Sequence, residues 1–339
     1  MGMGIQQHDS RESFTRRHAV LSIIGVTAMV YLLPSIEFVR EMAGFERRSI
    51  KKRPLMIFPL LKELGAGWYN MQPPPLLQKR AHGSRSLIVD VGLDKGEEFF
   101  LAIENGFEVV GFEPNPVSFP ALAQKCRSLT TSTCHVLEDP SSQSLPLNRT
   151  AGDSYLVHAA VGAVAGELDL FTGGSGSSFQ PNPNARNEKS KWKRVPVVRI
   201  DDFIREDVYL FKIDTQGFDP FVLQGAAKLF RDHVVRHLIF EVEPLAMTRN
   251  KITITETMEM VQDYGMLCFL ERLDVGLDCE FRGDTVEKFE EMYFSEKNVR
   301  GKAEELWAPC WEDFVCINIE KPWPGAELPV LGFDGVGAA

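Results

Sequence analysis

The sequence predicts an α/β fold built on a doubly wound, mostly parallel β-sheet. From residue 86 onward, short apolar runs alternate with segments that have helical patterns. This alternation is typical of parallel strands joined by crossover helices. The chain has 339 residues, of which 44% are hydrophobic and 25% charged, and it contains six cysteines. That composition excludes disordered, collagen-like and disulfide-scaffold proteins, and it fits one large globular domain or two modest ones.

Seven apolar runs are the expected strands. They span residues 86–92, 107–114, 154–162, 208–214, 236–244, 266–273 and 313–320. Four segments between them are the expected helices, at residues 96–105, 117–128, 219–231 and 254–264. Two further segments, 166–173 and 194–201, are expected to form an added hairpin or edge pair. The polar stretch between them, 173–193, is long enough to be either a functional lid or a disordered loop.

The region before the sheet contains an apolar run that predicts membrane attachment. Residues 19–33 carry no charge, follow Arg16 and Arg17, and end before Pro34. This run of fifteen residues is shorter than the roughly 20 that a spanning helix needs, but apolar residues up to position 39 can extend it. No small-residue cleavage site follows, which favours an uncleaved single-pass anchor over a removed signal peptide. We therefore expect residues 19–39 to hold the chain on a membrane of the secretory pathway.

The expected domain organisation has four parts. They are a signal-anchor or transmembrane leader at 1–40, a linker at 41–85, the α/β domain at 86–321 and a flexible tail at 322–339. The formal net charge is −10, and residues 1–53 contribute +4 of it, with nine Lys/Arg against five Asp/Glu. The rest carries 28 basic and 42 acidic residues, which is −14. A body this acidic argues against nucleic acid as a partner, because phosphate binding needs a basic surface.

The cysteines predict no metal site. No CxxC pair occurs, so a zinc site is not expected. Cys310 and Cys316 could pair in an oxidising lumen, but the sequence does not require it. A calcium loop beginning at Asp90 is excluded, because its twelfth position is Leu101 where such a loop needs Glu. No oligomeric state is predicted.

The first strand–turn–helix unit contains the strongest functional signal. An apolar strand ends near Asp90, and Gly92 and Gly96 allow a tight turn before the next helix. The following strand ends on Glu113, 23 residues after Asp90. In doubly wound sheets a ligand binds at the carboxyl ends of the strands, and an acid on the second strand accepts hydrogen bonds from a ribose diol. The unit therefore predicts a nucleoside-containing cofactor.

The form of the turn distinguishes between two such cofactors. A dinucleotide site would show GxGxxG, whereas this chain has DxGxxxG from Asp90 to Gly96. An acid at the strand end repels a pyrophosphate but suits the ammonium group of an amino-acid moiety. The pattern indicates S-adenosylmethionine rather than NAD. A purely structural glycine turn becomes improbable once Glu113 ends the next strand.

Three blocks of the sequence resemble the FkbM-type S-adenosylmethionine-dependent methyltransferases. They are IVDVGLDKG with VVGFEPNP, then VHAAVG with GELDLF, and finally VVRIDDFI with LFKIDTQGFDPFVLQGA and LIFEVEP. Together they span about residues 87–244. The resemblance implies a Rossmann-like, doubly wound, mostly parallel seven-stranded sheet, the class I methyltransferase fold. It also implies O-methylation of a hydroxyl on a sugar, a glycan or a secondary metabolite.

The resemblance also implies which residues bind the cofactor. They are Asp90, Gly92, Gly96 and Glu113, and we add Asn115 and Ala160 from the same blocks. The chain departs from the usual family pattern at four positions. It has Leu93 and Asp94 where the family more often has Ala and Asn. In the family's KIDVEGxE pattern, Gln216 replaces the first Glu and Asp219 replaces the second. Cofactor binding tolerates these changes, but a catalytic role for position 216 does not.

The expected catalytic residues lie at two neighbouring strand ends. Methyl transfer to a hydroxyl benefits from a general base, and Asp214 ends the fourth main strand, with Lys212 two residues before it. Glu241, in the next strand, is a second candidate base. The structural alternative is that Lys212 and Asp214 form an ion pair that anchors the strand end, while Asp219 caps the following helix. His158, near the expected adenine position, is interpreted as structural.

Three functions remain open from the sequence. The first is a membrane-tethered O-methyltransferase whose partner is a small-molecule or glycan hydroxyl. The second is a catalytically silent domain that keeps the fold as a binding module, which the Gln216 departure motivates. The third, an NAD-dependent oxidoreductase, is disfavoured because no GxG occurs in the turn after Asp90.

Overall fold

The computed structural model describes residues 58–59, 86–130, 132–140, 152–172, 191–242, 247, 250–271 and 312–321. The expected leader at 1–40, the tail at 322–339 and most of the stretch 173–193 lie outside these residues. Among the residues that are described, no helix has the length and apolar character that a membrane span requires.

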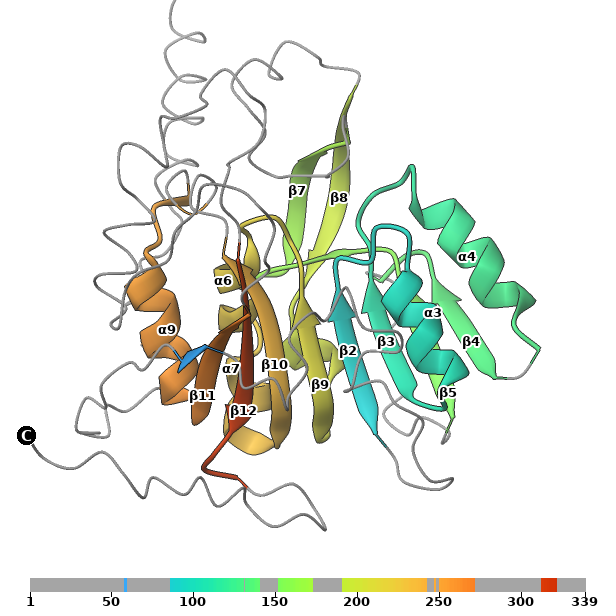
Figure 1. Cartoon of the computed structure of the whole chain (residues 1–339). Coiled ribbons are helices and arrows are strands. Elements are labelled where there is room, and N and C mark those ends of the chain that lie inside the picture. Colours follow the sequence, from blue (N-terminus) through green and yellow to red (C-terminus); the bar gives the residue numbers. More distant parts are fainter. Residues whose placement is uncertain are drawn as a thin grey trace, which may run out of the picture. The chain divides into compact units, whose positions relative to one another are not determined.

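A mostly parallel sheet is the centre of the molecule (Figure 1). Its strand order is β1-β11-β12-β10-β9-β2-β3-β5-β4, and β12 alone among these strands runs antiparallel to its neighbours, β10 and β11. The strands are β1 Phe58–Pro59, β2 Leu87–Val91, β3 Glu108–Phe112, β4 Thr133–Leu137, β5 Asp153–Val157, β9 Val208–Ile213, β10 Val235–Val242, β11 Met266–Glu271 and β12 Glu312–Asn318. All seven predicted strands are present in this sheet, which confirms the predicted fold class.

Sequence reasoning missed two strands, β1 and β4. Strand β1 has only two residues. Strand β4 pairs with β5 at the edge of the sheet, and none of its five residues is fully buried. An edge strand with this exposure lacks the continuous apolar run that marks a central parallel strand, so the sequence pattern did not reveal it.

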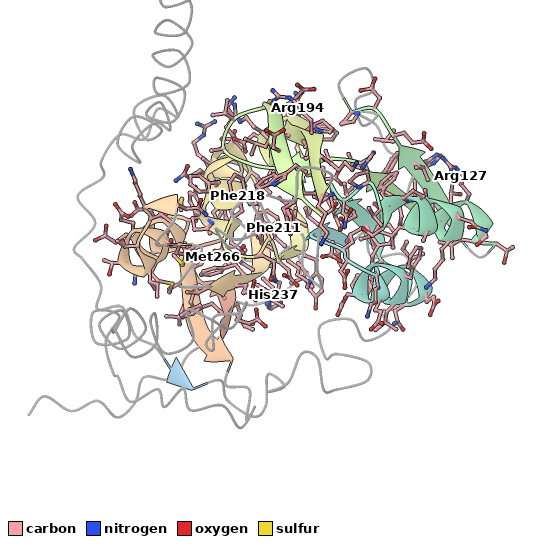
Figure 2. The ribbon with its side chains drawn as sticks, turned by 90° about the horizontal axis from the view of Figure 1, so that it is seen from above. Arg127, Arg194, Phe211, Phe218, His237 and Met266 are labelled. Carbon is pink, nitrogen blue, oxygen red and sulfur yellow. A yellow bond between two sulfur atoms is a disulfide. The ribbon has the colours of Figure 1, made fainter. Side chains whose placement is uncertain are left out.

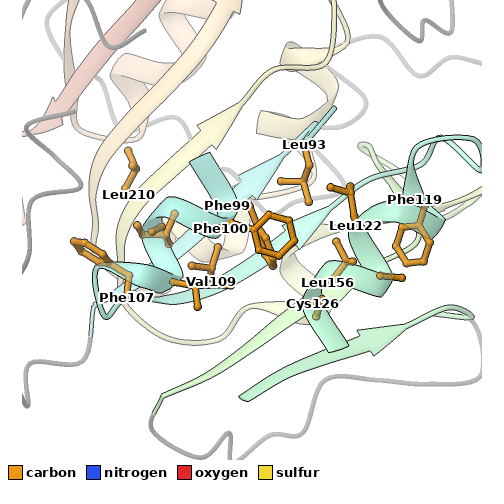
Figure 3. Packing of buried hydrophobic residues seen from close by; sticks show 14 of the residues in the cluster. Leu93, Phe99, Phe100, Phe107, Val109, Phe119, Leu122, Cys126, Leu156 and Leu210 are labelled. Atoms are coloured by element: carbon orange, nitrogen blue, oxygen red, sulfur yellow. The ribbon is translucent and has the colours of Figure 1, made fainter. Parts of the chain in front are cut away.

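The helices cover both faces of the sheet, as the doubly wound prediction requires. Their bounds are α3 Glu97–Glu104, α4 Phe119–Ser128, α5 Ile200–Phe203, α6 Asp219–Gln224, α7 Ala227–Asp232 and α9 Ile254–Asp263. Figure 1 shows α3 and α4 on one face and α6 and α7 on the other, and Figure 2 shows the side chains of the described residues, seen from above. On the first face, Phe99 and Phe100 of α3 and Leu122 of α4 pack with Val109 and Leu156 of the sheet (Figure 3).

The predicted helix at 219–231 is divided into α6 and α7. The break lies at Gly225, where an added Cβ would come within 2.2 Å of the Gly162 carbonyl oxygen. Helix α7 then begins under a buried carboxylate from α5, because Asp201 Oδ1 accepts hydrogen bonds from the backbone N–H groups of Lys228 and Leu229 at 2.9 and 3.0 Å. A distant residue thus satisfies the first N–H groups of α7.

A second, three-stranded sheet has the order β6-β8-β7. Its strands are β6 Ala160–Val161, β7 Gly166–Phe171 and β8 Trp192–Val198. The antiparallel pairing of β7 with β8 confirms the expected hairpin. In Figure 1 this hairpin extends beyond the ends of β9 and β2, on the side of the main sheet where the parallel strands end.

Two disulfides decide pairings that the sequence left open. Cys126 of α4 bonds to Cys134 of β4, and Cys268 of β11 bonds to Cys316 of β12. Cys316 therefore does not pair with Cys310, which the sequence allowed but did not require, and Cys310 lies outside the described residues. Cys268 and Cys316 face each other in the antiparallel register of β11 and β12, so the pairing follows from sheet topology and not from spacing along the chain.

Candidate functional site

The turn after β2 brings three strand ends together. Gly92 and Gly96 have φ values of 89° and 72°, a left-handed conformation that glycine adopts without strain. A Cβ at Gly92 would lie 1.8 Å from the Asp214 carbonyl oxygen, at the end of β9. The Gly92 N–H donates to the Phe112 carbonyl, at the end of β3, over 3.0 Å. Position 92 therefore has to be glycine.

Glu113 holds this turn in place. Its Oε2 accepts hydrogen bonds from the N–H groups of Leu93 and Asp94 at 3.1 and 3.0 Å. Its Oε1 accepts from the Asn115 N–H at 2.8 Å and from Ser118 Oγ at 3.3 Å. The side chain is buried, and burial raises the pKa of Glu113 against the opposing effect of these donors. The predicted ribose-binding acid thus also has a structural role in shaping the turn.

Lys212 connects two predicted acids. Its Nζ lies 3.5 Å from Asp90 Oδ1 and 3.6 Å from Asp214 Oδ2. The side chains of Asp90 and Lys212 are only 4% and 5% exposed, whereas that of Asp214 is 30% exposed. Burial, the largest cause, raises the pKa of Asp90 to about 6 although Lys212 opposes the change. The ion pair considered from the sequence is therefore present, and Asp214 is its solvent-accessible member.

The third predicted catalytic residue, Glu241, is connected to this network through Gln216. Gln216 Nε2 lies 3.3 Å from Asp214 Oδ1 and 3.2 Å from Glu241 Oε2. Glu241 is 7% exposed. The structure thus brings Asp90, Lys212, Asp214 and Glu241 into one polar cluster at the ends of β2, β9 and β10.

Asp219 does not cap α6 as the sequence suggested. Helix α6 has no side-chain hydrogen bond at its N-cap, Phe218. The Asp219 carboxylate turns back and accepts hydrogen bonds from the Thr215 N–H and hydroxyl and, at 2.9 Å, from the Glu241 N–H. It is fully buried, and burial raises its pKa to about 7. Asp219 therefore joins the end of β9 to the end of β10.

The other predicted residues lie in different surroundings. Asn115 follows Glu113 and accepts a hydrogen bond from the Val117 N–H at its own Oδ1, which forms a tight turn. The Ala160 side chain is buried in the small sheet with Leu170, Val195 and Val197, and its role in cofactor binding stays a prediction.

His158 lies beside the loop that contains Glu113. Its ring stacks on Phe119 with 4.2 Å between ring centroids. Burial lowers its pKa, so the neutral ring is favoured. Its Nε2 is buried and has no hydrogen-bond partner among the described residues. The stacking agrees with the structural interpretation of this histidine.

Sequence reasoning missed the contacts of Ser118 and Asn250. Ser118 immediately precedes α4, a position where serine commonly caps a helix, and it binds Glu113 instead. Asn250 Nδ2 donates to the Gly217 carbonyl at 2.9 Å across 33 residues. No local pattern marks a contact of that sequence separation.

The chain matches the model of a known protein family over more than half of its length. The family is described as "Methyltransferase FkbM domain", and the match covers residues 90–268. No curated protein sequence matches the chain.

Among solved structures the chain is similar to several methyltransferases. One is the methyltransferase FkbM from Methylobacillus flagellatus KT, with 14% identity, 69% of this chain and 43% of that chain covered, and a TM-score of 0.34. A second is a putative sarcosine dimethylglycine methyltransferase from Galdieria sulphuraria, with 10% identity, 71% and 80% covered, and a TM-score of 0.32. A third is the plantazolicin methyltransferase BpumL in complex with SAH, with 8% identity, 69% and 77% covered, and a TM-score of 0.29.

The chain spans less than half of the length of the Methylobacillus protein. At this level of structural similarity the family assignment rests on the sequence match. That match covers the end of β2 from Asp90 with the glycine turn, the Glu113 loop and the acidic cluster around Asp214. The chain belongs to the FkbM family of S-adenosylmethionine-dependent methyltransferases.

Proposed function

We propose that this protein transfers a methyl group to a hydroxyl oxygen of a sugar, a glycan or a secondary metabolite. One observation carries the proposal. Asp214 is the accessible carboxylate of a buried network, and its backbone lies directly against Gly92 of the predicted cofactor turn. A base beside the cofactor turn is what a hydroxyl acceptor needs, because its proton has to leave as the new bond forms.

The residues of the glycine turn fit S-adenosylmethionine. Gly92 and Gly96 hold the turn after β2 in a left-handed conformation, and Asp90 supplies a buried carboxylate for the ammonium group. Of the four donors to Glu113, Ser118 Oγ is the most distant, at 3.3 Å. Glu113 would hold the ribose hydroxyls of the cofactor, and Ser118 is the donor that such a ligand would displace most easily. When bound, the cofactor supplies a methyl group on a positively charged sulfur, and in-line displacement transfers it.

Asp214 is proposed to accept the proton of the acceptor hydroxyl. Its Oδ2 lies 3.6 Å from Lys212 Nζ, and its Oδ1 lies 3.3 Å from Gln216 Nε2. A carboxylate oxygen at this place can accept a proton from a hydroxyl that approaches the exposed side of Asp214. Glu241 is the second candidate, but its lower exposure makes it less accessible to an acceptor. In this scheme the oxygen–carbon bond forms as the sulfur–carbon bond breaks, and the proton moves to Asp214.

The protein is further proposed to act on the oxidising side of a membrane. The two disulfides support this proposal, because such bonds persist mainly in secreted and lumenal proteins. The membrane attachment itself is predicted from residues 19–39, outside the described residues. Carbonate extraction of expressing cells checks it: full release into the supernatant would mean a cleaved signal or no membrane attachment.

Two measurements on the purified protein test the proposed function. Calorimetric titration with S-adenosylmethionine and with NAD should show binding of the first and none of the second. Incubation with S-adenosylmethionine that carries an isotope-labelled methyl group, over a panel of sugars, glycans and hydroxylated metabolites, should then yield a labelled ether. Binding without transfer to any acceptor would favour the catalytically silent binding module.

A further inference from the structure

Gln216 places one amide between two acidic side chains. Its Nε2 lies within hydrogen-bond distance of Asp214 Oδ1 and Glu241 Oε2, at 3.3 and 3.2 Å. A side-chain amide has two N–H donors on its nitrogen and none on its oxygen. Two carboxylate partners therefore fix the orientation of the amide, and each of its hydrogens is directed to a different carboxylate.

The backbone of this turn is held in a conformation that glutamine rarely adopts. Gln216 has a φ of 53°, and Gly217 follows with a φ of 81°. A left-handed glutamine costs free energy and persists only where its surroundings enforce it. Asn250 Nδ2 binds the Gly217 carbonyl from one side, and the Asp219 carboxylate binds the Thr215 N–H from the other. These two contacts anchor the backbone of the residues immediately before and after Gln216.

Asp214 and Glu241 share Gln216 as a donor, and other charged groups lie around them. Lys212 Nζ lies beside Asp90 and Asp214, and Asp219 from α6 takes the Glu241 N–H. Glu98 of α3 adds a further negative charge near Asp90. Among the described residues, the cluster thus contains four carboxyl groups, from β2, the end of β9, α6 and β10, and the ammonium group of Lys212.

We infer that the Gln216 amide is the positioning group that keeps the Asp214 and Glu241 carboxylates together as an ionised pair. Two carboxylates at one site repel each other, and this repulsion makes one of them retain a proton. A donor between them favours the charged form of both. The inference rests on the proposed function in one respect: Asp214 has to be ionised to act as the proposed base. It gives position 216 a role that its departure from the usual family acid did not suggest.

A titration of the carboxyl groups tests the inference without an acceptor. The full-length protein is labelled with ¹³C at its Asp and Glu carboxyl carbons, and Asp214→Asn and Glu241→Gln identify the two signals. In Gln216→Met, which keeps the length of the side chain but has no N–H donor, the pKa of Asp214 or Glu241 should rise by about one or more. In Gln216→Glu the highest pKa of the cluster should rise further, because three carboxyl groups then share the site. Gln262→Glu on α9 adds the same charge elsewhere and should leave both signals unchanged.

A measurement on the wild-type protein tests the inference even if a variant does not fold. The two side-chain amide protons of Gln216 should shift with pH as Asp214 and Glu241 titrate. Amide signals that ignore pH, or carboxyl pKa values that stay the same in a folded Gln216→Met, would overturn the inference. Calorimetry with S-adenosylmethionine on the same samples reports separately on the proposed function. A wild type that binds no cofactor refutes that function, whereas the carboxyl titration still decides the role of Gln216.

Discussion

At the scale of single residues, the site is defined by how each buried carboxylate is satisfied. Glu113 binds the backbone of the glycine turn, Asp219 binds the ends of β9 and β10, and Asp90 binds Lys212. Asp214 differs because almost a third of its side chain is exposed. Glu113, Asp219 and Asp90 are therefore expected to matter for structure as well as for binding, and Asp214 chiefly for turnover.

Asp214→Asn is expected to slow methyl transfer and to leave cofactor affinity nearly unchanged. The substitution keeps the shape of the side chain but removes its basicity, and a general base contributes about 10²–10⁴-fold to the rate. Single-turnover rates with an acceptor from the labelled-methyl panel measure the first effect, and calorimetry measures the second. If the variant mainly unfolds, the ion pair with Lys212 is the more important role. If neither rate nor stability changes, Glu241 is the next candidate base.

Glu113→Ala is expected to reduce both cofactor affinity and stability. Loss of a charged hydrogen-bond acceptor costs roughly 1.5–3 kcal/mol, so the affinity should fall about tenfold to hundredfold. The variant also leaves the N–H groups of Leu93 and Asp94 without their acceptor, which lowers the free energy of unfolding. Calorimetry and urea denaturation measure the two effects. Ser118→Ala is the matched control, because it removes only the most distant of the four donors, and unchanged affinity in Glu113→Ala would refute the cofactor assignment.

At the scale of elements, long-range side-chain contacts determine where helices begin and end. Helix α9 has a local capping box, in which Thr253 Oγ accepts from the Glu256 N–H and Glu256 accepts from the Thr253 N–H. Helix α7 instead depends on distant residues at both ends. Asp201 binds its first N–H groups, and Lys321 Nζ donates to the carbonyls of Phe230, Arg231 and His233 near its last turn, at 2.6, 2.8 and 2.9 Å.

Lys321→Met is expected to destabilise the protein by roughly 1–3 kcal/mol, because the cation satisfies three carbonyl groups at the helix end. Urea denaturation of the variant and of the wild type gives the difference. Lys228→Met is the matched control, since Lys228 lies on the same helix with its side chain exposed. An equal loss in both variants would mean that the contacts of Lys321 contribute nothing specific.

The disulfide between β11 and β12 is expected to contribute roughly 2–4 kcal/mol to stability, because it closes a long loop in the unfolded chain. Cys268 and Cys316 are 48 residues apart, whereas Cys126 and Cys134 are 8 apart. The double variant Cys268→Ser/Cys316→Ser should therefore lose more stability than Cys126→Ser/Cys134→Ser. Thermal unfolding of both variants, with peptide mapping of the disulfides in the wild type, measures the difference. A larger loss in the second variant would contradict this order.

At the scale of the whole molecule, the buried acids make stability depend on pH in an unusual direction. Burial raises the pKa of Asp219 from 3.8 to about 7 and that of Asp90 from 3.8 to about 6. At these two carboxyl groups the folded state therefore binds more protons than the unfolded state between about pH 4 and pH 7. A group of this kind stabilises the fold fully at low pH, and this contribution is lost as pH rises through its folded-state pKa.

Asp219→Asn is expected to remove the contribution of Asp219 to this pH dependence of stability. The variant should have a lower free energy of unfolding than the wild type, because one oxygen cannot replace two acceptors. This difference in the free energy of unfolding should shrink as pH rises from 4 to 7. Urea denaturation at several pH values measures the difference between the two proteins. Asp232→Asn serves as the control, since that carboxylate is exposed and its pKa is lowered by Arg231. A difference between wild type and Asp219→Asn that is constant with pH would contradict the raised pKa.

The sequence by itself determined the fold class, the order of the seven main strands along the chain, and the turn with Gly92, Gly96 and Glu113. These features are local: strand burial follows from continuous apolar runs, and a tight turn follows from glycine at positions where the backbone is left-handed. The family also followed from local blocks whose order and spacing are visible in the chain. Asp90, Lys212, Asp214 and Glu241 were found for the same reason, because parallel strands end at one edge of the sheet.

Only the tertiary structure decided how these residues are connected. The break at Gly225, the disulfide between Cys268 and Cys316, and the bond between Asp219 and Glu241 each join positions that are distant in the sequence. Gln216 shows this most clearly, because the sequence presents it as the loss of an acid, whereas the fold places its amide between two carboxylates. The sequence specifies each strand end separately, and the packing of β9 against β10 decides which polar groups meet there, since a hydrogen bond requires donor and acceptor within about 3.5 Å of each other.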